Sequence, residues 1–143
     1  MNKPKFIVIH TVAKRGKTNI EIIRKWHVED NGWNDIGYHF YIKKGGEIQN
    51  GRDLETEGAH ALGFNSKSVG VCIEGHGDHE FWTYLQWIAL RTLVHEMRTI
   101  YGTGDIPIEN VIGHHETYTM QGKASPKTCP GAMIEMDFVR MHL

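Results

Sequence analysis

Residues 5–10 read Lys-Phe-Ile-Val-Ile-His, and this short run is the strongest indication of the architecture. In an extended conformation, Ile7 and Ile9 point to one side while Val8 and His10 point to the other. Apolar side chains on both sides are typical of a strand that lies inside a sheet covered on both faces. We therefore expect a central strand that ends at His10.

Turn residues and β-branched residues indicate the other strands. The turn Lys43-Lys44-Gly45-Gly46 predicts a β-hairpin, because glycine supplies the positive φ that tight hairpin turns require. Residues 69–74 are rich in valine and isoleucine and predict a second central strand. Residues 38–42 and 47–49 are the expected hairpin strands, and residues 111–113 form a short strand that leads to His114.

Helices are indicated by capping residues followed by apolar residues at helical spacing. A capping-box pattern at Thr18-Asn19-Ile20-Glu21 predicts a helix that ends at Asn31-Gly32, and Thr83 with Gln86 predicts the longest helix, up to Gly102. A brief closing helix is expected over about residues 134–141. The order of elements predicts an α/β fold: one domain, residues 1–143, with a mixed central sheet, one antiparallel hairpin and about three flanking helices.

Size and composition narrow the functional classes. The chain has 143 residues, of which 40 % are hydrophobic and 23 % charged, as in an ordinary single globular domain. The longest apolar runs are far shorter than the ~20 residues that cross a bilayer, so we expect no membrane insertion. The segment after Met1 lacks the pattern of a signal peptide, which predicts synthesis in the cytoplasm.

Charge is distributed unevenly along the chain. The net charge is −1, but residues 1–44 carry nine Lys or Arg against four Asp or Glu, and the remainder carries seven against thirteen. This asymmetry suits an anionic polymer or partner, or is simply a solvated surface of mixed charge. Because basic runs of nucleic-acid-arm density are lacking, we expect no direct nucleic-acid binding.

The two cysteines lie in different settings. Cys72 lies in an apolar run and is interpreted as a small buried hydrophobic residue. Cys129 lies in a polar loop, where it joins His10 and one of His114 and His115 as a candidate metal ligand. Two imidazoles and one thiolate leave one position open for water, which is the arrangement of a catalytic zinc rather than a structural one. Each histidine taken alone is more often structural.

Two further side chains fit hydrolytic chemistry at such a site. In an extended segment Lys127 projects on the same side as Cys129, where it could bind a developing oxyanion; an ordinary surface lysine is the alternative. Tyr38 opens a strand, and its hydroxyl could hydrogen-bond a water or shuttle its proton; a tyrosine packed at the rim of the core is the alternative.

Together these residues resemble the zinc-dependent N-acetylmuramoyl-L-alanine amidases of the amidase_2 and peptidoglycan-recognition-protein type, and among them small phage endolysins. The resemblance extends over nearly the whole chain through the motifs Val8-Ile9-His10, Trp26-His27, Gly37-Tyr38-His39-Phe40, Asn50-Gly51-Arg52, Gly58-Ala59-His60-Ala61, Gly70-Val71-Cys72, His114-His115-Glu116 and Lys127-Thr128-Cys129-Pro130. It implies one Zn²⁺ per chain bound by His10, His114 and Cys129, with His115 as a neighbour that is not a ligand. It also implies that Tyr38 and Lys127 are the catalytic pair.

The same resemblance implies the substrate and the setting. The substrate would be peptidoglycan, cut at the amide that joins N-acetylmuramic acid to the first L-alanine of the stem peptide. Some members of the family have a carboxylate ligand in place of Cys129 and a glutamate in place of Tyr38, so the match is with the thiolate branch. We further expect a bacteriolytic monomer that is made in the host cytoplasm and reaches the wall after release through the membrane. The expected substrate groove is lined by Trp33, Arg52, His60 and Asn65.

Three other hypotheses remain open at this point. Cys129 could be a nucleophile paired with His114 in an amidase of the cysteine-peptidase kind. The domain could bind peptidoglycan without cutting it, although the presence of Cys129 argues against this. An amidase of this kind could also bind and inhibit phage RNA polymerase through its basic amino-terminal surface.

Overall fold

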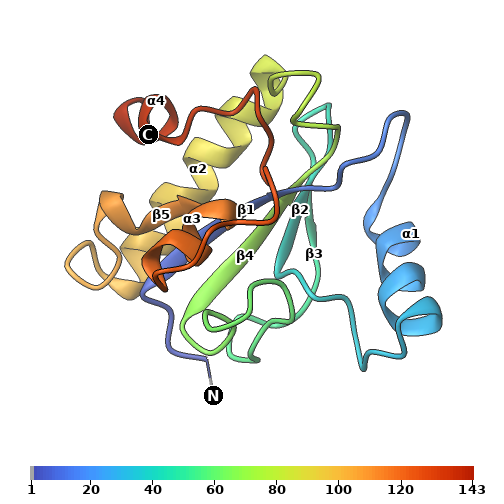
Figure 1. The fold of residues 1–143 in the computed structure, drawn as a ribbon, viewed down its shortest axis with the longest axis horizontal. Coiled ribbons are helices and arrows are strands. Elements are labelled where there is room, and N and C mark those ends of the chain that lie inside the picture. Colours follow the sequence, from blue (N-terminus) through green and yellow to red (C-terminus); the bar gives the residue numbers. More distant parts are fainter. Residues whose placement is uncertain (1) are drawn as a thin grey trace.

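The computed structural model describes residues 2–143 and contains one five-stranded mixed sheet (Figure 1). Met1, the first residue of the expected domain, lies outside the described residues. The strands are β1 (Phe6–Thr11), β2 (Phe40–Ile42), β3 (Ile48–Asn50), β4 (Ser68–Ile73) and β5 (Val111–Gly113), in the spatial order β3-β2-β4-β1-β5. Only the β2–β3 pair is antiparallel among these strands, so the predicted α/β sheet with one hairpin is confirmed.

The two strands with continuous apolar character occupy the interior of the sheet. β4 is the middle strand, and β1 lies between β4 and β5. All six residues of β4 are buried, and so are Ile7 to His10 in β1. The register pairs His10 with Cys72 at the carboxyl ends of these strands. Burial on both faces thus explains why these segments lack the apolar-polar alternation of a half-exposed strand.

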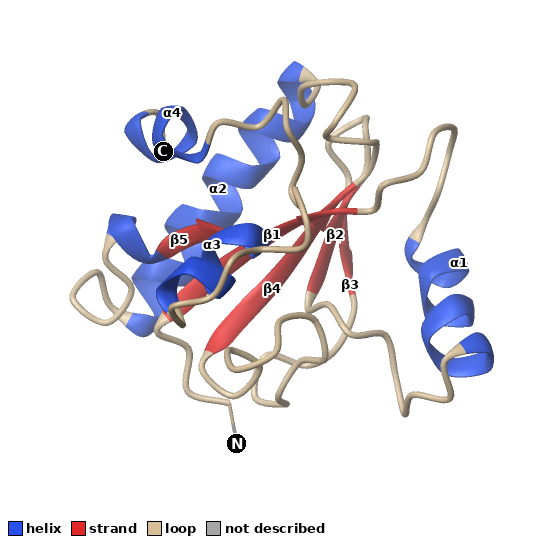
Figure 2. Ribbon diagram, viewed as in Figure 1, coloured by secondary structure: helices blue, strands red, loops and turns tan. Residues whose placement is uncertain are grey.

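Helices cover both faces of the sheet (Figure 2). They are α1 (Ile20–Lys25), which continues as a π-helical turn (Trp26–Asp30), α2 (Tyr84–Tyr101), α3 (His114–Met120) and α4 (Met136–Met141), with a short 3₁₀ turn at Ile108–Asn110. α2 packs through Leu90 and Val94 on the face that holds Ile7 and Ile9. α1 packs on the opposite face, the one to which His10 belongs.

The helix starts follow the predictions with one difference. Thr83 and Gln86 form the expected reciprocal capping box at the start of α2. At α1, however, the capping residue is Asn19, whose Oδ1 accepts a hydrogen bond from the backbone N–H of Ile22 at 2.9 Å. Thr18 is buried instead, and its hydroxyl contacts the hydroxyl of Tyr41.

The short helix α3 was not predicted. Its sequence, His-His-Glu-Thr-Tyr-Thr-Met, has no apolar repeat at helical spacing and contains β-branched threonines, which weakens the local signal. Contacts with other parts of the folded chain stabilise α3. Glu116 accepts a hydrogen bond from the backbone N–H of Gly113 at 2.9 Å, and the guanidinium of Arg140 binds both carboxylate oxygens of Glu116 at 2.7 and 3.0 Å. This ion pair joins α3 to α4.

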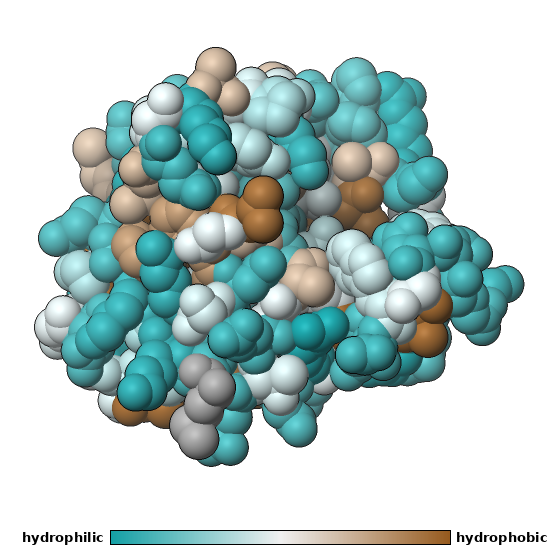
Figure 3. Space-filling view, turned by 60° about the horizontal axis from the view of Figure 1, so that its bottom comes forward, coloured by the Kyte–Doolittle hydropathy of each residue, from teal (hydrophilic) through white to brown (hydrophobic). Residues whose placement is uncertain are grey.

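The surface of the molecule agrees with the hydrophobic content of the chain, which is that of an ordinary globular domain. Within residues 2–143 the structure has no helix that is long and apolar enough to span a bilayer. The face shown in Figure 3 is mostly hydrophilic, with hydrophobic side chains in small separate patches.

Candidate functional site

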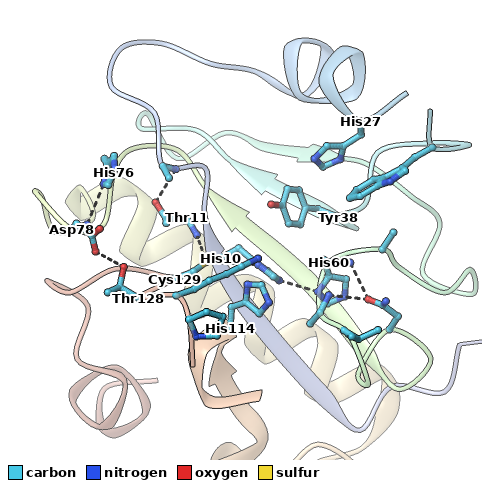
Figure 4. A pocket seen from close by; sticks show the side chains of 18 residues that line it. His10, Thr11, His27, Tyr38, His60, His76, Asp78, His114, Thr128 and Cys129 are labelled. Carbon is cyan, nitrogen blue, oxygen red and sulfur yellow. Dashed lines mark hydrogen bonds between the residues drawn. The ribbon is translucent and has the colours of Figure 1, made fainter. Parts of the chain in front are cut away.

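The fold brings three predicted ligand residues together from distant parts of the chain (Figure 4). His10 lies near the end of β1, His114 is the first residue of α3, and Cys129 lies in the loop between α3 and α4. One potential ligand atom from each of the three lies within 4.8 Å of the other two. Sheet register explains why the two histidines are close, because Ile9 pairs with Gly113 and the residue that follows each of them in the chain is a histidine. Their ring centroids are 4.5 Å apart.

Hydrogen bonds from neighbouring residues hold Cys129. The backbone N–H of Thr11 donates to its Sγ at 3.3 Å. His115 donates two hydrogen bonds to the backbone carbonyl oxygen of Cys129, one from its backbone N–H at 2.8 Å and one from its ring Nδ1 at 3.0 Å. His115 therefore fixes the loop that carries the sulfur.

A close crossing of two backbones supports the same loop. Gly77 and Gly131 are packed so tightly that a Cβ at residue 77 would lie 1.8 Å from the carbonyl oxygen of Pro130. Asp78 strengthens the crossing, since its Oδ1 accepts from the hydroxyl of Thr128 at 2.7 Å and from the backbone N–H of Ala132 at 2.8 Å. The segment after β4 thus clamps the loop that carries Cys129.

Burial determines the protonation states of these three groups. Desolvation lowers the pKa of His10 well below its usual value, with smaller effects from His60, His114 and Lys127, and lowers the pKa of His114 to about 4. Both imidazoles are therefore neutral at pH 7, and each has a free ring lone pair. Desolvation also raises the pKa of Cys129 to about 11, which is the opposite of an activated nucleophile.

The donor set and its spacing fit a zinc ion. Two neutral imidazoles and one cysteine sulfur are ligands that zinc prefers, and three of them leave a position open. The Sγ of Cys129 lies 3.8 Å from Nδ1 of His10. Ordinary zinc bond lengths and tetrahedral angles place a sulfur and a nitrogen ligand about 3.6 Å apart, so little movement is needed.

Tyr38 and Lys127 border the same cavity, which has a volume of about 750 Å³. Tyr38 precedes β2, and its ring centroid is 5.0 Å from that of His10. Burial raises the pKa of Tyr38 well above its usual value, with further contributions from Cys72 and Cys129, so the hydroxyl stays protonated and can donate a hydrogen bond. Lys127 is exposed and belongs to the loop that carries Cys129.

The four predicted groove residues have different positions. Trp33, His60 and Asn65 line the cavity. Arg52 lies elsewhere: its guanidinium donates to the backbone carbonyls of Ile36, Glu57 and Asp35, at 3.0, 2.7 and 3.2 Å, and so ties two loops together.

His60 and Asn65 also have structural contacts that the sequence did not indicate. Nδ1 of His60 lies 2.9 Å from Nε2 of His10, and burial lowers the pKa of His60 to about 3. Oδ1 of Asn65 accepts from the backbone N–H groups of His60 and Ala61, both at 2.9 Å. Asn65 thus shapes the loop that presents His60.

Some cavity residues were not expected. His27 falls within the first predicted helix, and it lines the cavity, where its Nδ1 accepts a hydrogen bond from the backbone N–H of Gly37 at 2.9 Å. His76, Asp78 and Thr11 also border the cavity, from loops and a strand end. The sequence signal for these three residues is their position at or just after the carboxyl ends of β1 and β4, where sites in such sheets tend to lie. The other free cysteine, Cys72, is fully buried, as predicted.

Comparison with known proteins agrees with this geometry. The family model described as N-acetylmuramoyl-L-alanine amidase, Amidase_2, matches residues 1–132. The chain belongs to the N-acetylmuramoyl-L-alanine amidase family. It is 36 % identical over 129 residues to the endolysin of Enterobacteria phage K11, which covers 85 % of this chain and 77 % of that protein. The comparison thereby confirms the predicted family and the predicted amidase activity.

Solved structures of an amidase and of a peptidoglycan-recognition protein show the same fold. The N-acetylmuramoyl-L-alanine amidase LysC from Clostridium intestinale URNW superposes with a TM-score of 0.85 at 28 % identity, over 99 % of this chain and 85 % of that one. Peptidoglycan-recognition protein LE in complex with tracheal cytotoxin, a monomeric diaminopimelic acid-type peptidoglycan, superposes with a TM-score of 0.79 at 26 % identity, over 96 % of this chain and 80 % of that one. The similarity to amidases thus extends over nearly the whole domain.

Proposed function

We propose that this amidase is a zinc-dependent endolysin that hydrolyses the amide between N-acetylmuramic acid and the L-alanine of the peptidoglycan stem peptide. The observation that carries the proposal is the convergence of His10, His114 and Cys129 at one cavity. The phage endolysin among its relatives and the peptidoglycan fragment bound to a protein of the same fold support the choice of substrate.

In this proposal His10, His114 and Cys129 hold one zinc ion per chain. The chemistry that zinc supplies in such a site is Lewis acidity toward a carbonyl oxygen and toward water. The protein contributes ligands in the required state, because the two histidines are already neutral. Only Cys129 has to release a proton when the ion binds, and a coordinating thiol does so readily.

Lys127 and Tyr38 act on the substrate from the cavity wall. Lys127 binds the oxygen of the scissile carbonyl as negative charge develops on it, which lowers the barrier because a positioned cation matches that charge. Tyr38 keeps its proton at neutral pH, so its hydroxyl donates a hydrogen bond to the oxygen of the water that attacks the amide. The exposed indole of Trp33, with His27 beside it at 4.6 Å between ring centroids, offers a flat apolar surface for a sugar ring.

The test is to strip and restore the metal while the bond that is cut is identified. We expect chelation to abolish release of muropeptides from purified peptidoglycan and stoichiometric Zn²⁺ to restore it. Each cut should create a free L-alanine amino group and no new reducing sugar end.

The same assay separates the rival mechanisms. Activity that survives chelation but is lost on thiol alkylation would show that Cys129 is a nucleophile. Binding of peptidoglycan without release of fragments, in protein that contains one zinc per chain, would show a recognition module.

A further inference from the structure

We propose that His60 is a positioning residue that sets the tautomer of His10, so that Nδ1 of His10 is free to face the metal. This inference rests on the proposed function, because it concerns how one ligand of that site is prepared. It gives His60 a role beyond the wall of the substrate groove.

The protons can be assigned along a chain of hydrogen bonds. The hydroxyl of Ser68 lies 2.7 Å from the carbonyl oxygen of Phe64, and since a carbonyl can only accept, the serine proton lies in that bond. Ser68 Oγ is then an acceptor toward Nε2 of His60, which lies 3.3 Å away and carries the proton between them. In a neutral imidazole the other ring nitrogen has the lone pair. Nδ1 of His60 is therefore an acceptor.

The same logic continues to the metal site. Nδ1 of His60 lies 2.9 Å from Nε2 of His10, so Nε2 of His10 must donate. The remaining lone pair of His10 is on Nδ1, the atom that lies 3.8 Å from the Sγ of Cys129. The opposite tautomer of His10 would set two lone pairs against each other at His60. A metal-binding histidine commonly donates its other N–H to an acceptor that fixes its orientation, and here that acceptor is a second histidine.

The ring and the backbone of His60 are both held by close contacts. Gly58 and Gly70 lie against its ring, and a Cβ added to either would lie 2.4 or 2.7 Å from Cδ2 of His60. Oδ1 of Asn65 fixes the backbone of His60 at 2.9 Å. Since both the ring and the main chain are held, the ring cannot swing away from His10 without displacing β4 or its own loop.

The experiment measures the tautomer of His10 directly in metal-free protein, from the ¹⁵N chemical shifts of its ring, and then the zinc dissociation constant by competition with a chelator. The variants are His60→Leu, which removes the acceptor, and His60→Asn, whose Oδ1 can take the place of Nδ1. Ser68→Ala is a milder variant that frees the ring of His60. The matched control is His39→Leu, because His39 is a buried histidine whose hydrogen bonds go to Thr56 and Gly70.

We expect His10 to carry its proton on Nε2 in the unsubstituted protein, in His60→Asn and in His39→Leu. In His60→Leu, and to a smaller extent in Ser68→Ala, His10 should populate both tautomers, and the zinc dissociation constant of His60→Leu should rise about 10- to 100-fold. A proton on Nδ1 of His10 in the unsubstituted protein would overturn the inference. So would an unchanged tautomer and zinc affinity in both His60→Leu and Ser68→Ala.

The two proposals can fail separately. If His10 responds to substitution of His60 but the protein shows no zinc-dependent hydrolysis, the proposed function fails and the tautomer assignment stands. If zinc-dependent hydrolysis is present and His10 does not respond, the tautomer assignment alone is wrong.

Discussion

At the scale of single residues, the two candidate metal-binding histidines differ in burial from the lysine that would act on the substrate. His10 and His114 are buried and neutral, whereas Lys127 is exposed to the cavity. Substitutions should therefore divide into two classes, one that changes metal content and one that changes turnover alone.

The first prediction compares Cys129→Ser and His10→Ala with Lys127→Ala. The first two variants should lose both zinc and activity, because each removes one of three ligands. Lys127→Ala should keep about one zinc per chain and lose roughly 10²- to 10³-fold in turnover, the usual effect of removing one donor to an oxyanion. Metal analysis and kinetics on a soluble muropeptide provide the measurements. Equal metal content in all proteins would rule out this ligand set.

The second prediction concerns the hydroxyl of Tyr38. Tyr38→Phe keeps the ring that packs beside His10 and removes only the hydrogen-bond donor. We expect unchanged zinc content and thermal stability with turnover reduced on the order of 10²-fold. Tyr118→Phe is the control, because its ring lies beside His114 at 5.7 Å between centroids without lining the cavity. A similar loss of turnover in both variants would show that the effect is not specific to Tyr38.

At the scale of elements, the loop that carries Cys129 depends on the crossing of Gly77 and Gly131. Gly77→Ala should lower the free energy of unfolding by about 1–3 kcal/mol, because its Cβ would overlap a backbone carbonyl and force the two segments apart. It should also weaken zinc binding, since the displaced loop holds the sulfur. Urea denaturation and chelator competition measure the two effects.

Gly45→Ala is the matched control for the glycine crossing. An added Cβ there meets no atom within 4 Å, so the free energy of unfolding should change by no more than about 0.5 kcal/mol. If Gly77→Ala were equally neutral, the crossing would not hold the loop.

The elements also show what the sequence could and could not predict. β1 and β4 were predictable because residues buried on both faces leave a continuous apolar run. α3 was not, because Glu116 and Arg140, which hold it, are 24 residues apart and form their ion pair only in the folded chain. The contact between His60 and His10 was unpredictable for the same reason. These residues are 50 positions apart, so the sequence pattern around either one does not indicate their hydrogen bond. The choice of His10, His114 and Cys129 as candidate metal ligands came from the resemblance to a family, because spacing alone left His114 and His115 equivalent.

At the scale of the whole molecule, the buried histidines make the stability of the metal-free protein depend on pH. Their pKa values are lower in the folded protein than the ordinary 6.5, so below pH 6.5 the unfolded chain binds more protons. Their contribution is complete above pH 6.5 and is lost as the pH falls toward about 4, the pKa of His114.

Urea denaturation of the metal-free protein at pH 7.5 and pH 5 tests this dependence. Between these values His114 alone should remove about 2 kcal/mol from the free energy of unfolding. His142→Gln, a substitution near the carboxyl end in an exposed residue, should leave the dependence unchanged. A free energy that is flat across this range would contradict the assigned neutral state of the histidines.

The positions of the three converging side chains also have a consequence for synthesis on the ribosome. Translation supplies the imidazole of His10 first, that of His114 more than 100 residues later, and the sulfur of Cys129 last of the three. A prematurely terminated product would thus lack the final donor, however well its sheet had formed. Under the proposed function, such a product could not complete the metal site and would not hydrolyse peptidoglycan.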